Sequence, residues 1–183
     1  MKLETALLLI PPLNVQHFVA PIRARFAPAS FPLVPAHITI MYPFVDIDKS
    51  REAVRILHEQ CRSIRPFDVT LDRYGHFPNA IYMEPEDPEP ILQLYRSIYK
   101  VFPDYLAYGG AFGGDLHPHL TVAELAEEMD PGTVPLPPIP TLRFSADRIY
   151  FYAGITDTEC EGQIPFIPLS VIPLGDQDDP GPE

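Results

Sequence analysis

Apolar and polar residues alternate in two ways along the chain. Segments in which apolar residues recur at every second position, or form a short apolar run, are typical of β-strands, whereas a spacing of three to four positions is typical of helices. The strand pattern covers residues 4–10, 34–41, 67–77, 80–85, 118–125, 142–154 and 165–175. The helix pattern covers residues 14–26, 50–63 and 88–102. This mixture of strands and helices predicts an α+β fold.

The order of these elements repeats. The first half contains a strand, a helix and then AHITIM (36–41), and the second contains a strand hairpin, a helix and then PHLTVA (118–123). We therefore expect one domain over residues 1–174, made of two similar, pseudo-symmetric lobes that each contribute one motif strand. Residues 175–183, GDQDDPGPE, are acidic and contain two prolines, so we expect a disordered tail.

Each motif strand carries a histidine and a threonine on one face. Residues two apart in a strand share a face, so His37 and Thr39 point together while their neighbours Val34, Ala36, Ile38 and Ile40 suit the core. By the same rule Met41 belongs to the open face and Tyr42 to the core. In the second strand, His119 and Thr121 share the open face. If the lobes face each other, the two histidines and two threonines converge on one cleft.

Two imidazoles and two hydroxyls in one cleft suit acid–base chemistry on a phosphate. Histidine has an ordinary pKa of about 6.5. One ring can therefore accept a proton from water while the other donates a proton to a leaving oxygen. The threonine hydroxyls can donate hydrogen bonds to non-bridging phosphate oxygens, where negative charge concentrates in the transition state. These groups predict cleavage of a phosphodiester without a metal.

The motifs also carry a resemblance. HITI (37–40) and HLTV (119–122) resemble the paired H-x-T/S-x motifs of the two-histidine phosphoesterase superfamily, which includes the bacterial proteins named 2′-5′ RNA ligases and the RNA cyclic phosphodiesterases. MYPF (41–44) is similar to the segment that follows the first motif in that branch. The similarity extends over most of residues 3–174. It implies two α+β lobes with antiparallel sheets flanked by helices and an active-site cleft between them.

The resemblance further implies an activity. It implies a metal-independent hydrolase, without a cofactor, that acts on a 2′,3′-cyclic phosphate or a 2′,5′-phosphodiester, with reverse ligation as an additional possibility. His37 and His119 would be the acid–base pair, in an order that the sequence leaves open, and Thr39 and Thr121 would bind the phosphate. The alternative is a non-catalytic module that binds a nucleotide or another phosphorylated ligand in the same cleft.

Charge and composition limit the kinds of partner that the protein is expected to bind. The 183 residues carry a formal net charge of −12 and a sequence pI of about 4.8, which argues against an extended nucleic-acid surface. A small nucleotide or an RNA end remains a suitable substrate. The apolar run TALLLI (5–10) is far too short to span a bilayer, and the two cysteines form no paired motif. We expect a cytoplasmic monomer that does not bind a membrane.

Three further segments contain candidate functional residues. In RIYFY (148–152), Arg148, Tyr150 and Tyr152 share one face and could pair with phosphate or stack on a base, or could be a solvent-facing or packing set. His117 forms an H-x-H pair with His119, but Asp115 and Glu124 stand at no recognisable ligand spacing, so no metal site is expected. YGGAFGGD (108–115) predicts a flexible loop beside the site.

Overall fold

The computed structural model describes residues 3–111, 115–126, 129–155 and 165–176. In this part of the chain the helices are α1 (Leu13–Phe26), α2 (Ser50–Cys61) and α3 (Glu89–Val101), with short 3₁₀ helices η1 (Ile47–Lys49), η2 (Ala107–Gly110) and η3 (Pro131–Thr133). The strands are β1 (Glu4–Leu9), β2 (Ile38–Met41), β3 (Phe67–Phe77), β4 (Ala80–Pro85), β5 (Leu120–Glu124), β6 (Leu142–Ala146), β7 (Arg148–Gly154) and β8 (Ile167–Pro173). The predicted α+β class is confirmed.

All eight strands form one antiparallel sheet in the order β6-β3-β4-β5-β2-β1-β7-β8. The two motif strands, β5 and β2, lie side by side at its centre, with three strands beyond each of them. They are joined through one register pair, Ile38↔Leu120. The predicted lobes are therefore two four-stranded halves of a curled sheet that meet at the motif strands.

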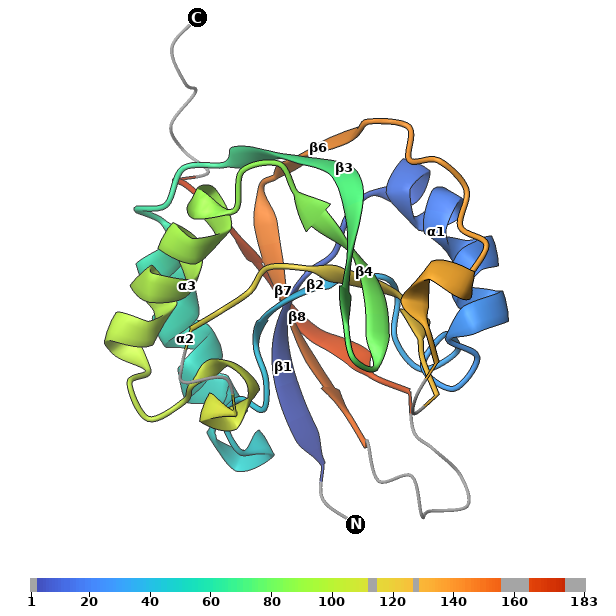
Figure 1. Ribbon diagram of the computed structural model, residues 1–183. Coiled ribbons are helices and arrows are strands. Elements are labelled where there is room, and N and C mark those ends of the chain that lie inside the picture. Colours follow the sequence, from blue (N-terminus) through green and yellow to red (C-terminus); the bar gives the residue numbers. More distant parts are fainter. Residues whose placement is uncertain (1–2, 112–114, 127–128, 156–164, 177–183) are drawn as a thin grey trace, which may run out of the picture.

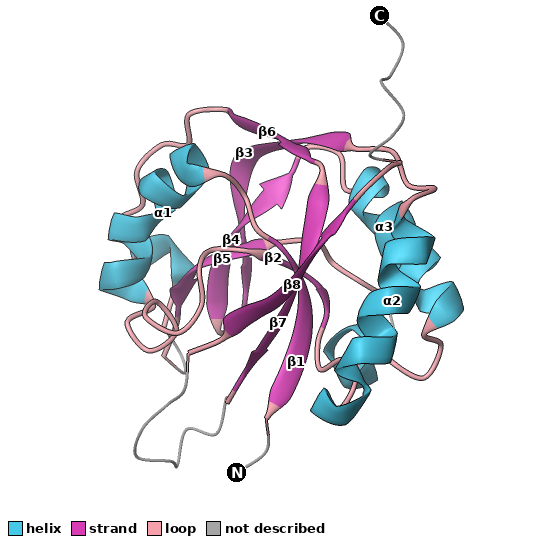
Figure 2. Cartoon of the chain, turned by 180° about the vertical axis from the view of Figure 1, so that it is seen from behind, coloured by secondary structure: helices cyan, strands magenta, loops and turns pink. Residues whose placement is uncertain are grey.

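Helix α1 lies at one side of the molecule, and α2 and α3 lie together at the other (Figures 1 and 2). Helix α1 packs against β5, α3 packs against β2, and α2 packs against β8. The helix that precedes each motif strand therefore covers the motif strand of the other half. This exchange couples the halves through a shared core, to which Val19 of α1, Ile98 of α3 and Leu120 of β5 all belong.

Strand β2 departs from simple alternation at its end. The register with β1 shifts so that Leu8 pairs with Thr39 but Leu7 pairs with Met41. One extra residue in β2 places Met41 in the core beside Ile40. The predictions for Met41 and Tyr42 are therefore wrong, because the irregularity reverses the faces after Ile40. Tyr42 lies on the open side, where it lines the same cavity as His37 and Thr39.

The first two helices begin without a capping side chain. Their N-cap positions are Pro12 and Lys49, and neither has a capping side-chain hydrogen bond. Helix α1 begins one residue before Asn14 and continues through Pro21.

The last described residues close the fold. The Leu174 N–H donates to the Asp147 carbonyl (2.7 Å), and the Gly175 N–H donates to the Cys61 carbonyl (3.0 Å). Most of the predicted acidic tail, residues 177–183, and the second cysteine, Cys160, lie outside the described residues. Among the described helices, none is long and apolar enough to cross a membrane.

Candidate active site

Helix α1 holds the segment that leads into the first motif. The Gln16 side-chain amide donates to the Ala36 carbonyl (2.7 Å) and accepts from the Ala36 N–H (3.0 Å). On the same helix, the buried Arg23 donates to the Val34 carbonyl (3.0 Å). These bonds anchor the backbone just before His37, so the position of the first imidazole depends on α1.

Aromatic rings surround the second imidazole. The ring centroid of His119 lies 5.0 Å from that of Phe77 and 5.1 Å from that of Tyr82, on the neighbouring hairpin. Tyr108, from η2, stacks on His119 with centroids 6.0 Å apart and an interplanar angle of 22°. The second motif is thus positioned mainly by packing, whereas the first is positioned by hydrogen bonds.

Both imidazoles make the same backbone contact. His37 Nδ1 lies 2.8 Å from the Pro35 carbonyl oxygen, and His119 Nδ1 lies 2.6 Å from the His117 carbonyl oxygen. A carbonyl can only accept, so each Nδ1 carries the proton of the bond. The Nε2 atom of each neutral ring is then the lone-pair nitrogen that can take up a substrate proton.

The sheet register pairs the motifs crosswise. Because Ile38 pairs with Leu120 in antiparallel orientation, one further step in each direction sets Thr39 across from His119 and His37 across from Thr121. Each histidine therefore has a threonine hydroxyl of the opposite half as its neighbour across the strands. All four predicted side chains are half-buried, and the sheet brings them together.

Burial favours the neutral form of both imidazoles. It lowers the pKa of His37 to about 4, against the opposing hydrogen bond to Pro35, and the charges of Arg23 and His119 act in the same direction as burial. Burial also lowers the pKa of His119, again against its carbonyl bond, with a contribution from His117. His37 is therefore neutral at neutral pH.

The two motifs line different cavities. One of about 170 Å³ is lined by His37, Thr39, Tyr42 and Phe166 together with apolar residues of β1. A second of about 500 Å³ is lined by His119, Thr121, Tyr108 and Phe77, among others. The first is small and largely apolar, and the second is large enough for a nucleotide-sized group.

The predicted binding residues of β7 lie beside the first cavity. Ile149 and Phe151 are buried in the core, and Tyr150 and Tyr152 face the other side, as the alternation predicted. With Arg148 they line a separate groove of about 720 Å³ that does not include either motif histidine. Arg148 is paired with Asp147 through two 2.8 Å hydrogen bonds, so it reaches a ligand only by sharing or breaking that pair.

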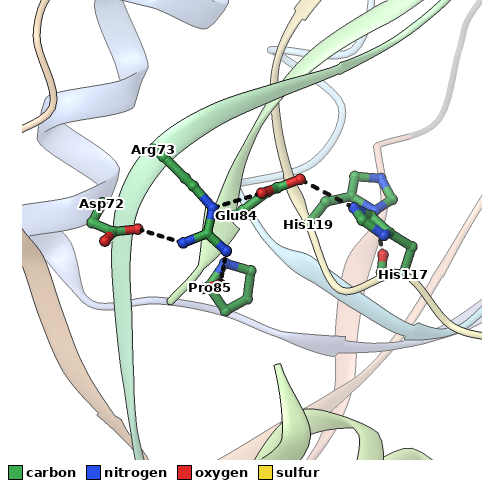
Figure 3. Close-up of polar contacts among 6 residues, drawn as sticks. All are labelled: Asp72, Arg73, Glu84, Pro85, His117 and His119. Atoms are coloured by element: carbon green, nitrogen blue, oxygen red, sulfur yellow. Dashed lines mark hydrogen bonds and ion pairs between the residues drawn. The ribbon is translucent and has the colours of Figure 1, made fainter. Parts of the chain in front are cut away.

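His117 belongs to a polar chain rather than to a group of metal ligands. Its Nε2 lies 3.5 Å from Glu84, whose other oxygen accepts from Arg73 (2.8 Å), and Arg73 also contacts Asp72 (Figure 3). Among the described residues, no three histidine, cysteine, aspartate or glutamate side chains are grouped so as to hold a metal ion.

Sequence reasoning missed several residues of the site. Phe77, Glu84 and Tyr108 border the motifs in space but are separated from them in sequence by a strand or a loop. Tyr42 directly follows the first motif strand, and the extra residue in β2 turns it to the face of the motif. For Tyr108 a signal did exist: a large aromatic residue opens the glycine-rich run YGGAFGG.

Comparison with known proteins places this geometry in a family. A sequence profile of the 2′-5′ RNA ligase superfamily matches residues 11–157. A Bacillus licheniformis protein, provisionally named a phosphoesterase, is 29% identical over 127 residues, which are 67% of this chain and 71% of that protein. The crystal structure of E. coli LigT in apo form matches with a TM-score of 0.69 at 20% identity, covering 96% of this chain and 99% of LigT. LigT complexed with 3′-AMP matches with a TM-score of 0.68 at 18% identity, covering 96% and 100%.

The curled antiparallel sheet with a histidine–threonine strand from each half defines an α+β protein of the LigT fold. The chain belongs to the 2′-5′ RNA ligase superfamily, the two-histidine phosphoesterases. The family resemblance predicted from the two motifs is confirmed.

Proposed function

We propose that the protein hydrolyses a 2′,3′-cyclic phosphate, on a small nucleotide or an RNA end, or a 2′,5′-phosphodiester, by two-histidine acid–base catalysis without a metal. The observation that carries this proposal is the matched pair of Nδ1–carbonyl bonds, which leaves the Nε2 atoms of His37 and His119 for proton transfer. The superfamily match and the complex of LigT with 3′-AMP support the substrate class.

The different surroundings of the two histidines favour an order. His37 is the more suitable general base, because burial and the nearby Arg23 charge both disfavour its protonated form, whereas His119 is surrounded by aromatic rings that can stabilise an imidazolium. It takes a proton from water as the water oxygen forms a bond to phosphorus. The bond between phosphorus and the leaving ribose oxygen breaks, and protonated His119 gives that oxygen a proton. The Thr39 and Thr121 hydroxyls donate to the non-bridging oxygens, and the product is a phosphomonoester.

A substrate panel tests the proposal. Purified protein is incubated in EDTA with 2′,3′-cyclic nucleotides, cyclic-phosphate-ended RNA, 2′,5′-oligoadenylates and ADP-ribose cyclic phosphate, and the products are separated by chromatography. We expect turnover of at least one substrate with a bell-shaped pH profile. His37→Ala and His119→Ala should each reduce kcat by about 10²- to 10⁴-fold.

The exposed His17 of α1 offers a matched control. His17→Ala should retain full activity, and circular dichroism should show that all three variants are folded. Turnover that survives both motif substitutions contradicts the proposal. Activity that is lost in EDTA and restored by zinc or manganese points to a metal mechanism instead. Binding of every substrate without turnover supports the non-catalytic alternative.

A further inference from the structure

Tyr108 lies outside the motifs and contacts both of them. Its helix, η2, packs against β2, where the Tyr108 hydroxyl interacts with Thr39 of the first motif, and its ring stacks on His119 of the second. Thr39 and His119 are also the residues that the sheet register sets across from each other. Tyr108 therefore covers one of the two crosswise pairs of the site.

The backbone at Tyr108 is unusual. Among the described residues other than glycine, Tyr108 alone has a positive φ, with φ 52° and ψ 34°. This left-handed conformation disfavours residues that carry a Cβ, and backbone strain of this kind tends to occur at functional sites. Two glycines that follow, Gly109 and Gly110, also have positive φ, so the chain turns back sharply and directs the tyrosine toward the motif strands.

The surroundings of Tyr108 keep its phenol neutral. Burial raises the pKa of the hydroxyl above its ordinary value, against the hydrogen bond with Thr39. Contact between the neutral phenol and Thr39 limits the rotation of the Thr39 hydroxyl beside a bound phosphate. The ring, meanwhile, shields one face of His119 from water and limits its rotation.

We propose that Tyr108 is a positioning residue that orients the Thr39 hydroxyl through its own hydroxyl and fixes the His119 imidazole through its ring. The two contacts act on different steps: the hydroxyl supports charge stabilisation on the phosphate, and the ring supports proton donation to the leaving oxygen. The inference rests on the proposed function, because both steps belong to that reaction.

Two substitutions separate the contacts. Tyr108→Phe removes the hydroxyl and keeps the ring, so we expect kcat to fall roughly tenfold with KM within about twofold and the pH profile unchanged. Tyr108→Ala removes both, so kcat should fall further. The alkaline limb of the profile, which reports His119, should also move to higher pH, because burial is what lowers the pKa of that ring.

A double-mutant cycle shows whether the hydroxyl acts through Thr39. Tyr108→Phe should have little additional effect on kcat in a Thr39→Ala background. If the two residues acted independently, the factors by which the two substitutions lower kcat would multiply. Tyr105→Phe is the matched control, because Tyr105 lies in the same connection but packs on Phe44 and Phe102, away from the motifs. It should leave kcat unchanged.

Failure of the proposed function and failure of the role of Tyr108 give different results. If the wild-type protein turns over no substrate, the proposed function fails. If it is active and Tyr108→Phe retains full kcat, or its effect multiplies with that of Thr39→Ala, the role of the hydroxyl is overturned. If the alkaline limb does not move to higher pH in a folded Tyr108→Ala protein, the role of the ring is overturned.

Discussion

His37 and His119 have equivalent positions in the two halves but different surroundings. Hydrogen bonds from Gln16 and Arg23 hold the backbone before His37, and a positive charge lies near that ring. Three aromatic rings surround His119, and a stacked ring can also stabilise an imidazolium. The first environment suits a proton acceptor and the second suits a proton donor, so the two histidines are not interchangeable.

A substrate with an activated leaving group tests this assignment. A p-nitrophenyl phosphodiester releases a stable phenolate, so its hydrolysis needs no proton from a general acid. We expect His119→Ala to recover much of its lost activity on this substrate, and His37→Ala to stay inactive, because water still needs a base. Release of nitrophenolate by each variant, relative to its activity on the natural class of substrate, is the measurement. Recovery in His37→Ala instead would reverse the two roles.

At the scale of elements, Phe166, just before β8, forms part of the wall of the first cavity. Gly154 ends β7 and is buried, and the N–H of Phe166 donates to the Leu33 carbonyl (2.8 Å), which holds that chain in place. Phe166 lines the cavity with His37 and packs edge-on against Tyr42. The close approach of the two segments therefore depends on glycine at position 154.

Adding one methyl group at this position should disturb the wall. A Cβ on Gly154 would stand 2.8 Å from Phe166 Cα, which is backbone and cannot turn aside. We expect Gly154→Ala to lower the free energy of unfolding by about 1–3 kcal/mol and to raise KM, as measured by urea denaturation and steady-state kinetics. Gly132→Ala is the control, since its Cβ would meet only Asp130 at 3.4 Å. Equal stability of both variants would contradict the argument.

The elements also show what the sequence could and could not predict. Both motif faces could be predicted, because strand periodicity depends on local order alone. The face of Tyr42 could not, because the extra residue in β2 is a property of its pairing with β1. The contact of Tyr108 with Thr39 and His119 depends on where η2 returns to the sheet, which periodicity does not reveal.

At the scale of the whole molecule, the buried His37 makes the stability of the fold depend on pH. The ring of His37 is partly buried beside the first cavity, and burial lowers its pKa, so the folded protein resists its protonation. In the unfolded chain His37 is exposed to water and takes up a proton at about pH 6.5. The arrangement that keeps a base neutral therefore makes the folded state sensitive to acid.

The sign of this effect is fixed by the pKa of His37, which folding depresses to about 4. Above about pH 6.5 the ring is neutral in both states and has no effect. As the pH falls toward about 4 the unfolded state binds a proton that the folded state does not, so stability is lost, by up to about 3 kcal/mol. Below that pH both states are protonated and the loss stops growing.

Replacing the ring should remove this part of the acid sensitivity. His37→Gln cannot titrate, so its free energy of unfolding should fall less between about pH 7 and 4.5 than that of the wild type, by roughly 2 kcal/mol. His17→Gln, at an exposed position on α1, should follow the wild type. Urea denaturation of the three proteins at both pH values, in a buffer without phosphate, is the measurement. A wild type and a His37→Gln variant that lose equal stability would show that the buried ring carries no such penalty, and with it the reason for assigning His37 as the base would be lost.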